Sequence, residues 1–182
     1  DEDIIKAFHT TESVKLTPAN RPKIEGSIAV GDVIDPETGE VYLESGEIFT
    51  KEVVDKLTTV SIKEVDVLST IKDPTLSPVK DPLILNALKE DHSSTHEEAL
   101  LKIYQRLRPG NPQQLEKAKE LFHEKFFDTN RYRLGKVGRF RINRKFSQTI
   151  PEDQMTLDPE DYVNAIRYIL NLRKGKGHVD DI

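Results

Sequence analysis

Residues 28–68 alternate between apolar and polar positions at a spacing of two, which predicts short β-strands. Strands are expected at 30–34 and 40–43, on either side of a turn at 35–39 whose Pro and Gly favour a tight reversal. Thr50 is expected to cap a short helix over 51–57, and 61–68 is expected to be a further strand. Residues 1–29 are weakly patterned and predict a short helical piece followed by an extended connector.

Beyond residue 95 the apolar positions recur three and four residues apart, the spacing of amphipathic helices. Thr95 and Glu98 form a capping box, and Asn111 with Pro112 predicts the start of a second helix. A last helix is expected to begin at Asp158 and to end before Gly175. The stripes expected to be buried are Leu100, Ile103, Tyr104 and Leu107; Leu115, Ala118, Leu121 and Phe122; and Tyr162, Ile166, Ile169 and Leu170.

These elements predict an α+β fold, with a small β-rich N-terminal unit, a mainly helical C-terminal part and a basic hairpin. The expected organisation is a connector over 1–29, a β-rich unit over 30–72, a Pro-containing linker over 73–95 and a helical core over 96–182.

Composition excludes several classes of protein. No apolar run approaches the roughly 20 residues of a membrane helix. The chain has no Cys, which excludes disulfides, thiolate zinc sites and cysteine nucleophiles. The acidic start at Asp1 does not resemble a signal peptide, and a first residue other than Met indicates a processed or excised fragment. A cytoplasmic location is the expectation.

Charge is distributed unevenly along the chain. Residues 1–100 carry 10 Lys and Arg against 21 Asp and Glu, whereas residues 101–182 carry 17 against 11. Between Thr129 and Pro151 there is no acidic residue. That window holds seven cations: Arg131, Arg133, Lys136, Arg139, Arg141, Arg144 and Lys145.

Apolar residues alternate with these cations, and we interpret the segment as a strand or hairpin that turns near Gly135 and Gly138. Alternation would direct Arg131, Arg133, Arg139 and Arg141 away from the core, and Tyr132, Leu134, Phe140 and Ile142 towards it. A row of cations of this kind suits the phosphates of a nucleic acid. The alternative is a solvated basic edge strand that discourages aggregation.

Catalytic and metal-binding patterns are weak. The carboxylates around Asp35 lack the spacing of an EF-hand loop, and we interpret them as turn residues. His92 and His96 are four residues apart, but His92 precedes the expected cap at Thr95, so the two would not share a helix face. Gly175–Lys176–Gly177 follows a helix instead of opening one, so it does not form a phosphate loop. We expect no catalytic residue, no metal and no cofactor in this chain.

Several longer motifs occur in order along the second half of the chain. They are YQRLRPGNP at 104–112, FFDTNRYRLGKVGR at 126–139 with Asn143 and Arg144, and GKGHVDDI at 175–182. Together these motifs resemble the lobe of the β subunit of bacterial DNA-directed RNA polymerase. The resemblance is strong over 100–182, looser over 30–68 and faint over 1–29. No convincing match covers 70–95, which could be a lineage insertion.

The resemblance implies a non-catalytic arm of a nucleotidyltransferase, with the catalytic magnesium on another subunit. In that family the lobe forms one wall of the DNA cleft and lies beside promoter and downstream DNA. The implied partners are DNA, the other polymerase subunits, a sigma factor and a NusG-type elongation factor, at a cytoplasmic, nucleoid-associated location; no membrane or small-molecule substrate is implied.

Two groups of residues follow from the resemblance. The gate loop at the cleft mouth corresponds to Arg108, Pro109, Gly110, Asn111 and Pro112. The DNA-facing residues are expected to be Arg108, Arg131, Arg133, Lys136, Arg139, Arg141 and Arg144. For Arg139, Asn143 and Arg144 an internal bond is an equally good interpretation. The other readings of the chain are a protein-interaction module that uses the acidic half without appreciable DNA binding in isolation and, more remotely, a small independent enzyme.

Overall fold

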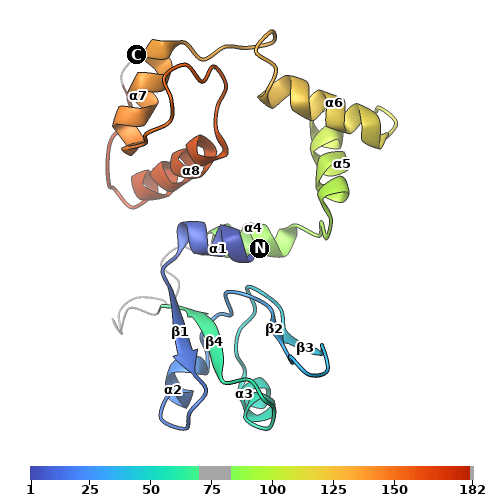
Figure 1. Cartoon of the computed structure of the whole chain (residues 1–182), viewed down its shortest axis with the longest axis vertical. Coiled ribbons are helices and arrows are strands. Elements are labelled where there is room, and N and C mark those ends of the chain that lie inside the picture. Colours follow the sequence, from blue (N-terminus) through green and yellow to red (C-terminus); the bar gives the residue numbers. More distant parts are fainter. Residues whose placement is uncertain (70–82, 181–182) are drawn as a thin grey trace. The chain divides into compact units, whose positions relative to one another are not determined.

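The structure of the protein is a computed structural model that describes residues 1–69 and 83–180. The chain divides into two compact units, Asp1–His92 and Ser93–Ile182, and each is described here by itself (Figure 1). Within the described residues, all strands belong to the first unit, while the second is built from helices and connecting segments. The predicted α+β fold class is confirmed.

The first unit contains two small antiparallel sheets. Strand β1 (Thr11–Lys15) pairs with β4 (Glu64–Leu68), and β2 (Val33–Ile34) pairs with β3 (Val41–Leu43). Because successive strand residues face opposite sides, Val65 and Val67 both point inward, where they join a core around Phe49. Strand β1 lies within the stretch that the sequence predicted only as an extended connector.

Four short helices complete the first unit: α1 (Glu2–Phe8), α2 (Arg21–Ile24), α3 (Lys51–Leu57) and α4 (Leu83–Glu90). The predicted cap of α3 is confirmed, since Thr50 Oγ1 accepts a hydrogen bond from the Val53 amide at 3.3 Å. Helix α4 stands inside the range expected to be a linker. The Pro-containing part of that range, 73–82, lies outside the described residues.

The second unit begins with the packed helix pair α5 (His96–Leu107) and α6 (Leu115–Phe126), whose contact buries Leu100, Tyr104 and Ala118. Asn111 was predicted to cap α6, and this is wrong. The backbone remains extended at Gln114, with φ −131° and ψ 124°, so Gln114 precedes the first helical residue. Pro112 accordingly lies in the connection between the two helices.

The predicted basic hairpin is also wrong, because residues 136–146 form a helix, α7 (Lys136–Phe146). Its inward positions are Arg139, Ile142, Asn143 and Phe146, which recur at the three- and four-residue spacing of one helix face. Two of these four are strongly polar, so the inner face of α7 carries no continuous apolar stripe. The period-two alternation that suggested a strand placed Arg139 outward and Phe140 inward, whereas Arg139 is buried and Phe140 is half exposed.

The last helix, α8 (Pro159–Arg173), begins with the predicted Asp158 cap, but its predicted inward stripe is wrong. Tyr162, Ile166 and Ile169 are each at least 40% exposed. The more covered face carries Asp161, Ala165, Tyr168 and Leu172, a series at helical spacing. The ion pair of Asp161 with Arg139 of α7 turns the Asp161 face of α8 inward, and not the face that carries the predicted stripe.

Replacing Thr95 with Ala should lower the free energy of unfolding by about 1 kcal/mol, because an N-cap acceptor of α5 is lost. Thr95 Oγ1 accepts the Glu98 amide at 3.2 Å, whereas the Glu98 carboxylate accepts the Ser94 amide, outside the helix, at 2.8 Å. Chemical unfolding followed by far-UV circular dichroism would measure the loss. Thr149→Ala, at an exposed Thr outside any helix, is the matched control. An equal effect of the two substitutions would contradict the capping role.

Candidate nucleic-acid interface

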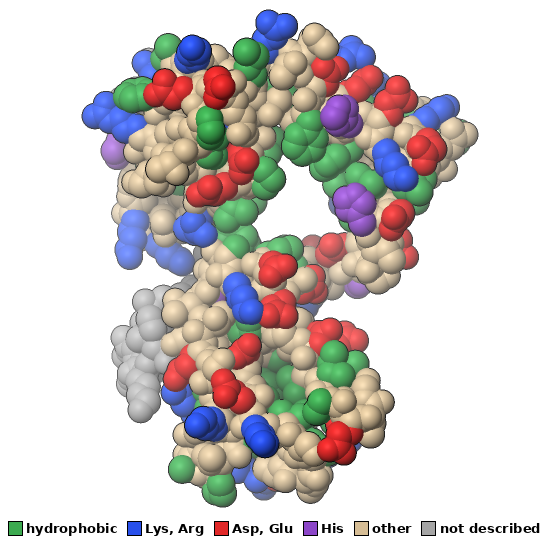
Figure 2. Space-filling model, in the orientation of Figure 1, with side chains coloured by type: hydrophobic (Ala, Val, Ile, Leu, Met, Phe, Trp, Pro, Cys, Tyr) green, Lys and Arg blue, Asp and Glu red, His purple; other side chains and the backbone are tan. Residues whose placement is uncertain are grey.

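Helix α7 presents two chemically different faces. The inner face carries Arg139, Ile142, Asn143 and Phe146. The outer face carries three cations and two apolar side chains, of which Val137 is 68% exposed and Phe140 is 51% exposed. The outer positions are Lys136, Val137, Phe140, Arg141 and Arg144. Lys and Arg side chains protrude from the surface formed by α7 and α8 (Figure 2).

Arg139 is the buried member of the basic segment, with no exposed side-chain surface. Its Nη1 donates to Asp161 Oδ1 at 2.9 Å, and its Nη2 donates to the carbonyl oxygen of Thr156 at 2.9 Å. Asp161 Oδ2 in turn accepts the Asp158 amide at 2.8 Å, which closes the capping box of α8. Arg139 therefore makes the internal bonds that were one of its two expected roles, and it fixes α7 to the start of α8.

The environment of Asp161 shifts its pKa in two opposing directions. Burial raises the pKa, since it disfavours the charged carboxylate. The hydrogen bond from Arg139, the backbone N–H of Asp158 and the charge of Arg139 lower it, and the net result is a pKa below the usual value. Asp161 is therefore held as a carboxylate at neutral pH, paired with the Arg139 guanidinium.

Three other cations of the segment also have partners. Arg131 pairs with Glu124 at 3.2 Å, and Arg133 Nε donates to the Thr129 carbonyl oxygen at 2.9 Å. Lys145 pairs with Asp180 and lies 4.2 Å above the centre of the Tyr168 ring, and the Asp180 hydrogen bond raises the pKa of Lys145. Arg131 and Arg133 remain exposed, so their contacts leave them accessible to solvent.

Lys136, Arg141 and Arg144 differ from the rest of the segment. All three are exposed, and none forms an ion pair with a residue of 1–69 or 83–180. Asn143, which the sequence grouped with Arg144, bonds internally through its Nδ2 to the Ile150 carbonyl oxygen at 2.7 Å. The outer face of α7 is thus the part of the basic segment with uncommitted positive charge.

The predicted gate loop connects α5 and α6. Arg108 ends α5, and its amide donates to the Tyr104 carbonyl oxygen at 2.8 Å. Gly110 has φ +85°, a left-handed conformation that a residue with a side chain rarely adopts. The residues from Arg108 to Pro112 are all exposed, which leaves the Arg108 guanidinium available to a partner.

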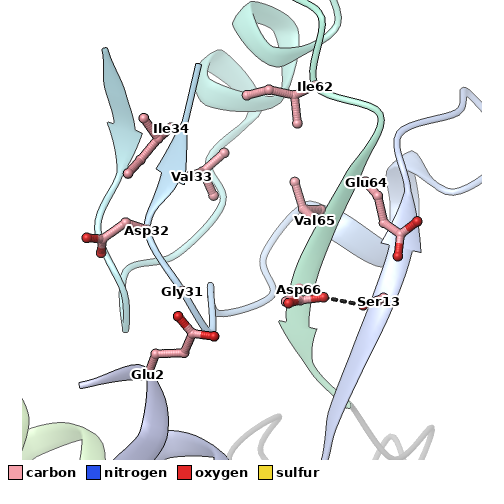
Figure 3. Close-up of a pocket in the computed structure, with 10 residues that line it drawn as sticks. All are labelled: Glu2, Ser13, Gly31, Asp32, Val33, Ile34, Ile62, Glu64, Val65 and Asp66. Carbon is pink, nitrogen blue, oxygen red and sulfur yellow. Dashed lines mark hydrogen bonds between the residues drawn. The ribbon is translucent and has the colours of Figure 1, made fainter. Parts of the chain in front are cut away.

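The first unit carries a hollow of the opposite charge. A pocket of about 390 Å³ lies between β4 and the β2–β3 pair (Figure 3). Glu2, Asp32, Glu64 and Asp66 contribute carboxylates to it, and apolar side chains such as Val33 and Val65 line the remainder. Ser13 donates a hydrogen bond to Asp66. A surface of this charge repels phosphate, so this pocket is unsuited to a nucleic acid.

Within residues 1–69 and 83–180, no group of three or more His, Cys, Asp or Glu side chains is placed to hold a metal ion. Asp35 behaves as a turn residue: its Oδ1 accepts the Glu37 amide at 2.8 Å, and this bond lowers the pKa of Asp35. His96 is the first residue of α5 and His92 precedes the Thr95 cap, as predicted. In the same part of the chain, no helix is long and apolar enough to cross a membrane.

The chain belongs to the RNA polymerase family described as Rpb2, domain 2, whose match covers residues 51–182. It is similar to proteins named DNA-directed RNA polymerase subunit beta. The relative from Rhodopirellula baltica is 45% identical over 189 residues, covering 100% of this chain. Those from Sorangium cellulosum and Methylacidiphilum infernorum are 39% and 38% identical, covering 94% and 100% of it. The chain spans 15%, 12% and 14% of the lengths of these three relatives.

These matches confirm the resemblance to the β subunit that the sequence motifs indicated. The family match begins at residue 51 and so includes α3, β4 and every helix of the second unit. Sequence reasoning found the cations of the outer α7 face but missed Asp161 as the partner of Arg139. An Asp in the first turn of a helix suits the helix dipole, and it also suits a buried guanidinium.

Proposed function

We propose that this chain is the lobe of a bacterial RNA polymerase β subunit and that it lines the path of DNA without carrying out catalysis. The observation that supports this most directly is the outer face of α7. That face carries three exposed cations without ion-pair partners in the described chain. The chain belongs to an RNA polymerase family, and its relatives are named DNA-directed RNA polymerase subunit beta.

The spacing of these cations suits a polyanion. Lys136 and Arg144 are eight residues apart, a rise of about 12 Å along a helix. Arg141 lies between them in sequence, so the three charges form an elongated patch and not a single point. Each phosphate that such a patch neutralises releases counterions, which makes binding fall as salt concentration rises.

Phe140 adds a second kind of contact to the same face. It is 51% exposed and lies one turn from both Lys136 and Arg144. Exposed aromatic rings between cations are used to stack unpaired bases, at about 1–3 kcal/mol per base. The outer face of α7 is therefore suited to DNA that is at least partly single-stranded, as at the edge of a melted region.

The gate-loop residues extend the proposal to protein partners. Arg108 is exposed at the start of the α5–α6 connection, where the family resemblance places a loop at the cleft mouth. We propose that this loop meets the opposite wall of the cleft and a NusG-type factor, and that other polymerase subunits and a sigma factor bind elsewhere on the lobe. The magnesium of the reaction would belong to another subunit.

Replacing Lys136, Arg141 and Arg144 together with Ala should reduce the salt dependence of DNA binding. Three lost phosphate contacts correspond to a decrease of about 2–3 in the slope of log K against log salt concentration. The measurement is fluorescence anisotropy of a labelled forked DNA with the 182-residue chain over a salt series.

The matched control replaces Lys51, Lys56 and Lys89, three exposed lysines of the first unit, with Ala. It removes the same charge from the chain and should leave the slope nearly unchanged. Equal decreases in both triple variants would show that net charge and not the α7 face controls binding, and would refute the proposal for this surface.

A protein-interaction module is the second candidate, and the acidic pocket of the first unit favours it. The pocket combines carboxylates with an apolar lining, a combination that suits a Lys- or Arg-containing segment of another protein. If the wild-type chain fails to bind forked DNA even at low salt, this candidate becomes the better account of the isolated chain.

A further inference from the structure

Several polar atoms around the Arg139–Asp161 pair are buried without a partner in the described structure. They are Arg139 Nε, Asn143 Oδ1, and both Nε2 and Oε1 of Gln148. Arg139 is fully buried, and Gln148 is 9% exposed. A buried polar atom without a hydrogen bond costs about 1–3 kcal/mol, and native proteins rarely retain several of them together.

The three side chains share one neighbourhood. Arg139 and Asn143 are one helical turn apart on the inner face of α7. The backbone of Gln148 returns to the end of that helix, since its amide donates to the Asn143 carbonyl oxygen at 2.9 Å. The Gln148 side chain also lies near enough to Asp161 to favour its ionised form, and Arg139 donates to the same carboxylate.

The chemistry of the unpartnered atoms identifies their ligand. Arg139 Nε is a donor, whereas Asn143 Oδ1 and Gln148 Oε1 are acceptors. The other polar atom of Gln148, Nε2, is a donor that lies beside the Asp161 carboxylate. An anion would satisfy only the donors, and a cation would satisfy only the acceptors. Water is the common ligand that donates and accepts together, and buried waters typically make about three hydrogen bonds to such groups.

We propose that a buried structural water bridges Arg139, Asn143 and Gln148 and completes the contact between α7 and α8. It connects the inner face of α7 to the segment that follows it and holds the Arg139 guanidinium against Asp161. This water belongs to the interior of the second unit, whereas the proposed DNA contact uses the outer face of α7. The two proposals are therefore independent, and each can fail without the other.

A crystal structure at a resolution that shows ordered solvent tests the proposal directly. We expect one density peak within hydrogen-bond distance of at least three of the four atoms. Direct bonding of the Asn143 amide to the Gln148 amide, with no solvent between them, would overturn the proposal. A bromide soak provides a second test, because anomalous signal at this position would indicate an anion site instead of water.

Magnetic relaxation dispersion of water provides a solution measurement, since it counts long-lived internal waters. Gln148→Met has nearly the shape of the wild-type side chain but removes one donor and one acceptor. We expect its dispersion amplitude to fall by the contribution of one water. Gln113→Met, at an exposed position, should leave the amplitude unchanged. An unchanged amplitude in a folded Gln148→Met chain would contradict the proposal; if that variant fails to fold, the wild-type crystal structure decides.

Discussion

Replacing Arg139 with Met should destabilise the second unit by about 3–5 kcal/mol, the usual cost of removing one partner of a buried ion pair. Met fills much of the volume of the Arg side chain, but Asp161, which is 4% exposed, keeps its charge without the guanidinium. The Thr156 carbonyl oxygen also loses the closer of its two donors, leaving Gln154 Nε2 at 3.4 Å. A loss of this size is a large share of the 5–15 kcal/mol that stabilises a typical domain. Urea unfolding followed by circular dichroism measures it.

Two variants separate the ion pair from a general effect of charge. Arg141→Met removes a cation from the exposed face of the same helix and should change stability by no more than about 0.5 kcal/mol. In Arg139→Met/Asp161→Leu both buried charges are gone, and much of the lost stability should return. Hydrogen exchange at α7 and α8 would localise the effect. A mild loss in Arg139→Met, similar to that of Arg141→Met, would refute the structural role of the pair.

Arg139 also illustrates which part of the site the sequence could predict. The concentration of cations between Thr129 and Pro151 is a property of composition, so it was visible without any structure. Which cations face outward depends on whether the segment is a strand, in which every second side chain shares a face, or a helix, in which every third or fourth does. An interior Arg requires a partner far along the chain, here Asp161, and local patterns carry no information about that pairing.

The elements that were predicted correctly have local causes. The Thr50 and Thr95 caps and the stripe of α5 depend on side chains within one or two helical turns. Helix α7 was missed because its inner face carries Arg139 and Asn143 at positions where an apolar residue would normally signal a helix. Strand β1 was missed for a related reason: it is short, and its pairing with β4 joins residues more than 40 positions apart.

The charged residues of the basic segment therefore serve different purposes. Arg139 pairs with Asp161 in the interior, and Lys145 pairs with Asp180 and contacts the Tyr168 ring. Only part of the segment, the outer face of α7, is both charged and uncommitted in the described chain. A few such cations bind a polyanion weakly, which suits a surface that guides DNA while other parts of a larger assembly retain it.

The stability advantage of the wild-type chain over Asp161→Asn should be large at neutral pH and should decrease in acid. Asn cannot neutralise Arg139, so at about pH 7 the variant should be less stable by about 3 kcal/mol or more. The folded environment lowers the pKa of Asp161, whereas the unfolded chain has the ordinary value of about 3.9. The extra stability is therefore fully present above the unfolded pKa and is lost as the pH falls through the lower, folded pKa.

Urea unfolding of both chains at a series of pH values from about 7 to about 2.5 measures this difference. Other carboxylates titrate in both chains, so their contributions largely cancel when the two free energies are subtracted. The remaining difference should fall with a slope of up to about 1.4 kcal/mol per pH unit once the unfolded Asp161 begins to bind a proton. A difference that stays constant down to acid pH would mean that the charge of Asp161 does not stabilise the fold, and that the carboxylate serves only as a hydrogen-bond acceptor that Asn cannot replace.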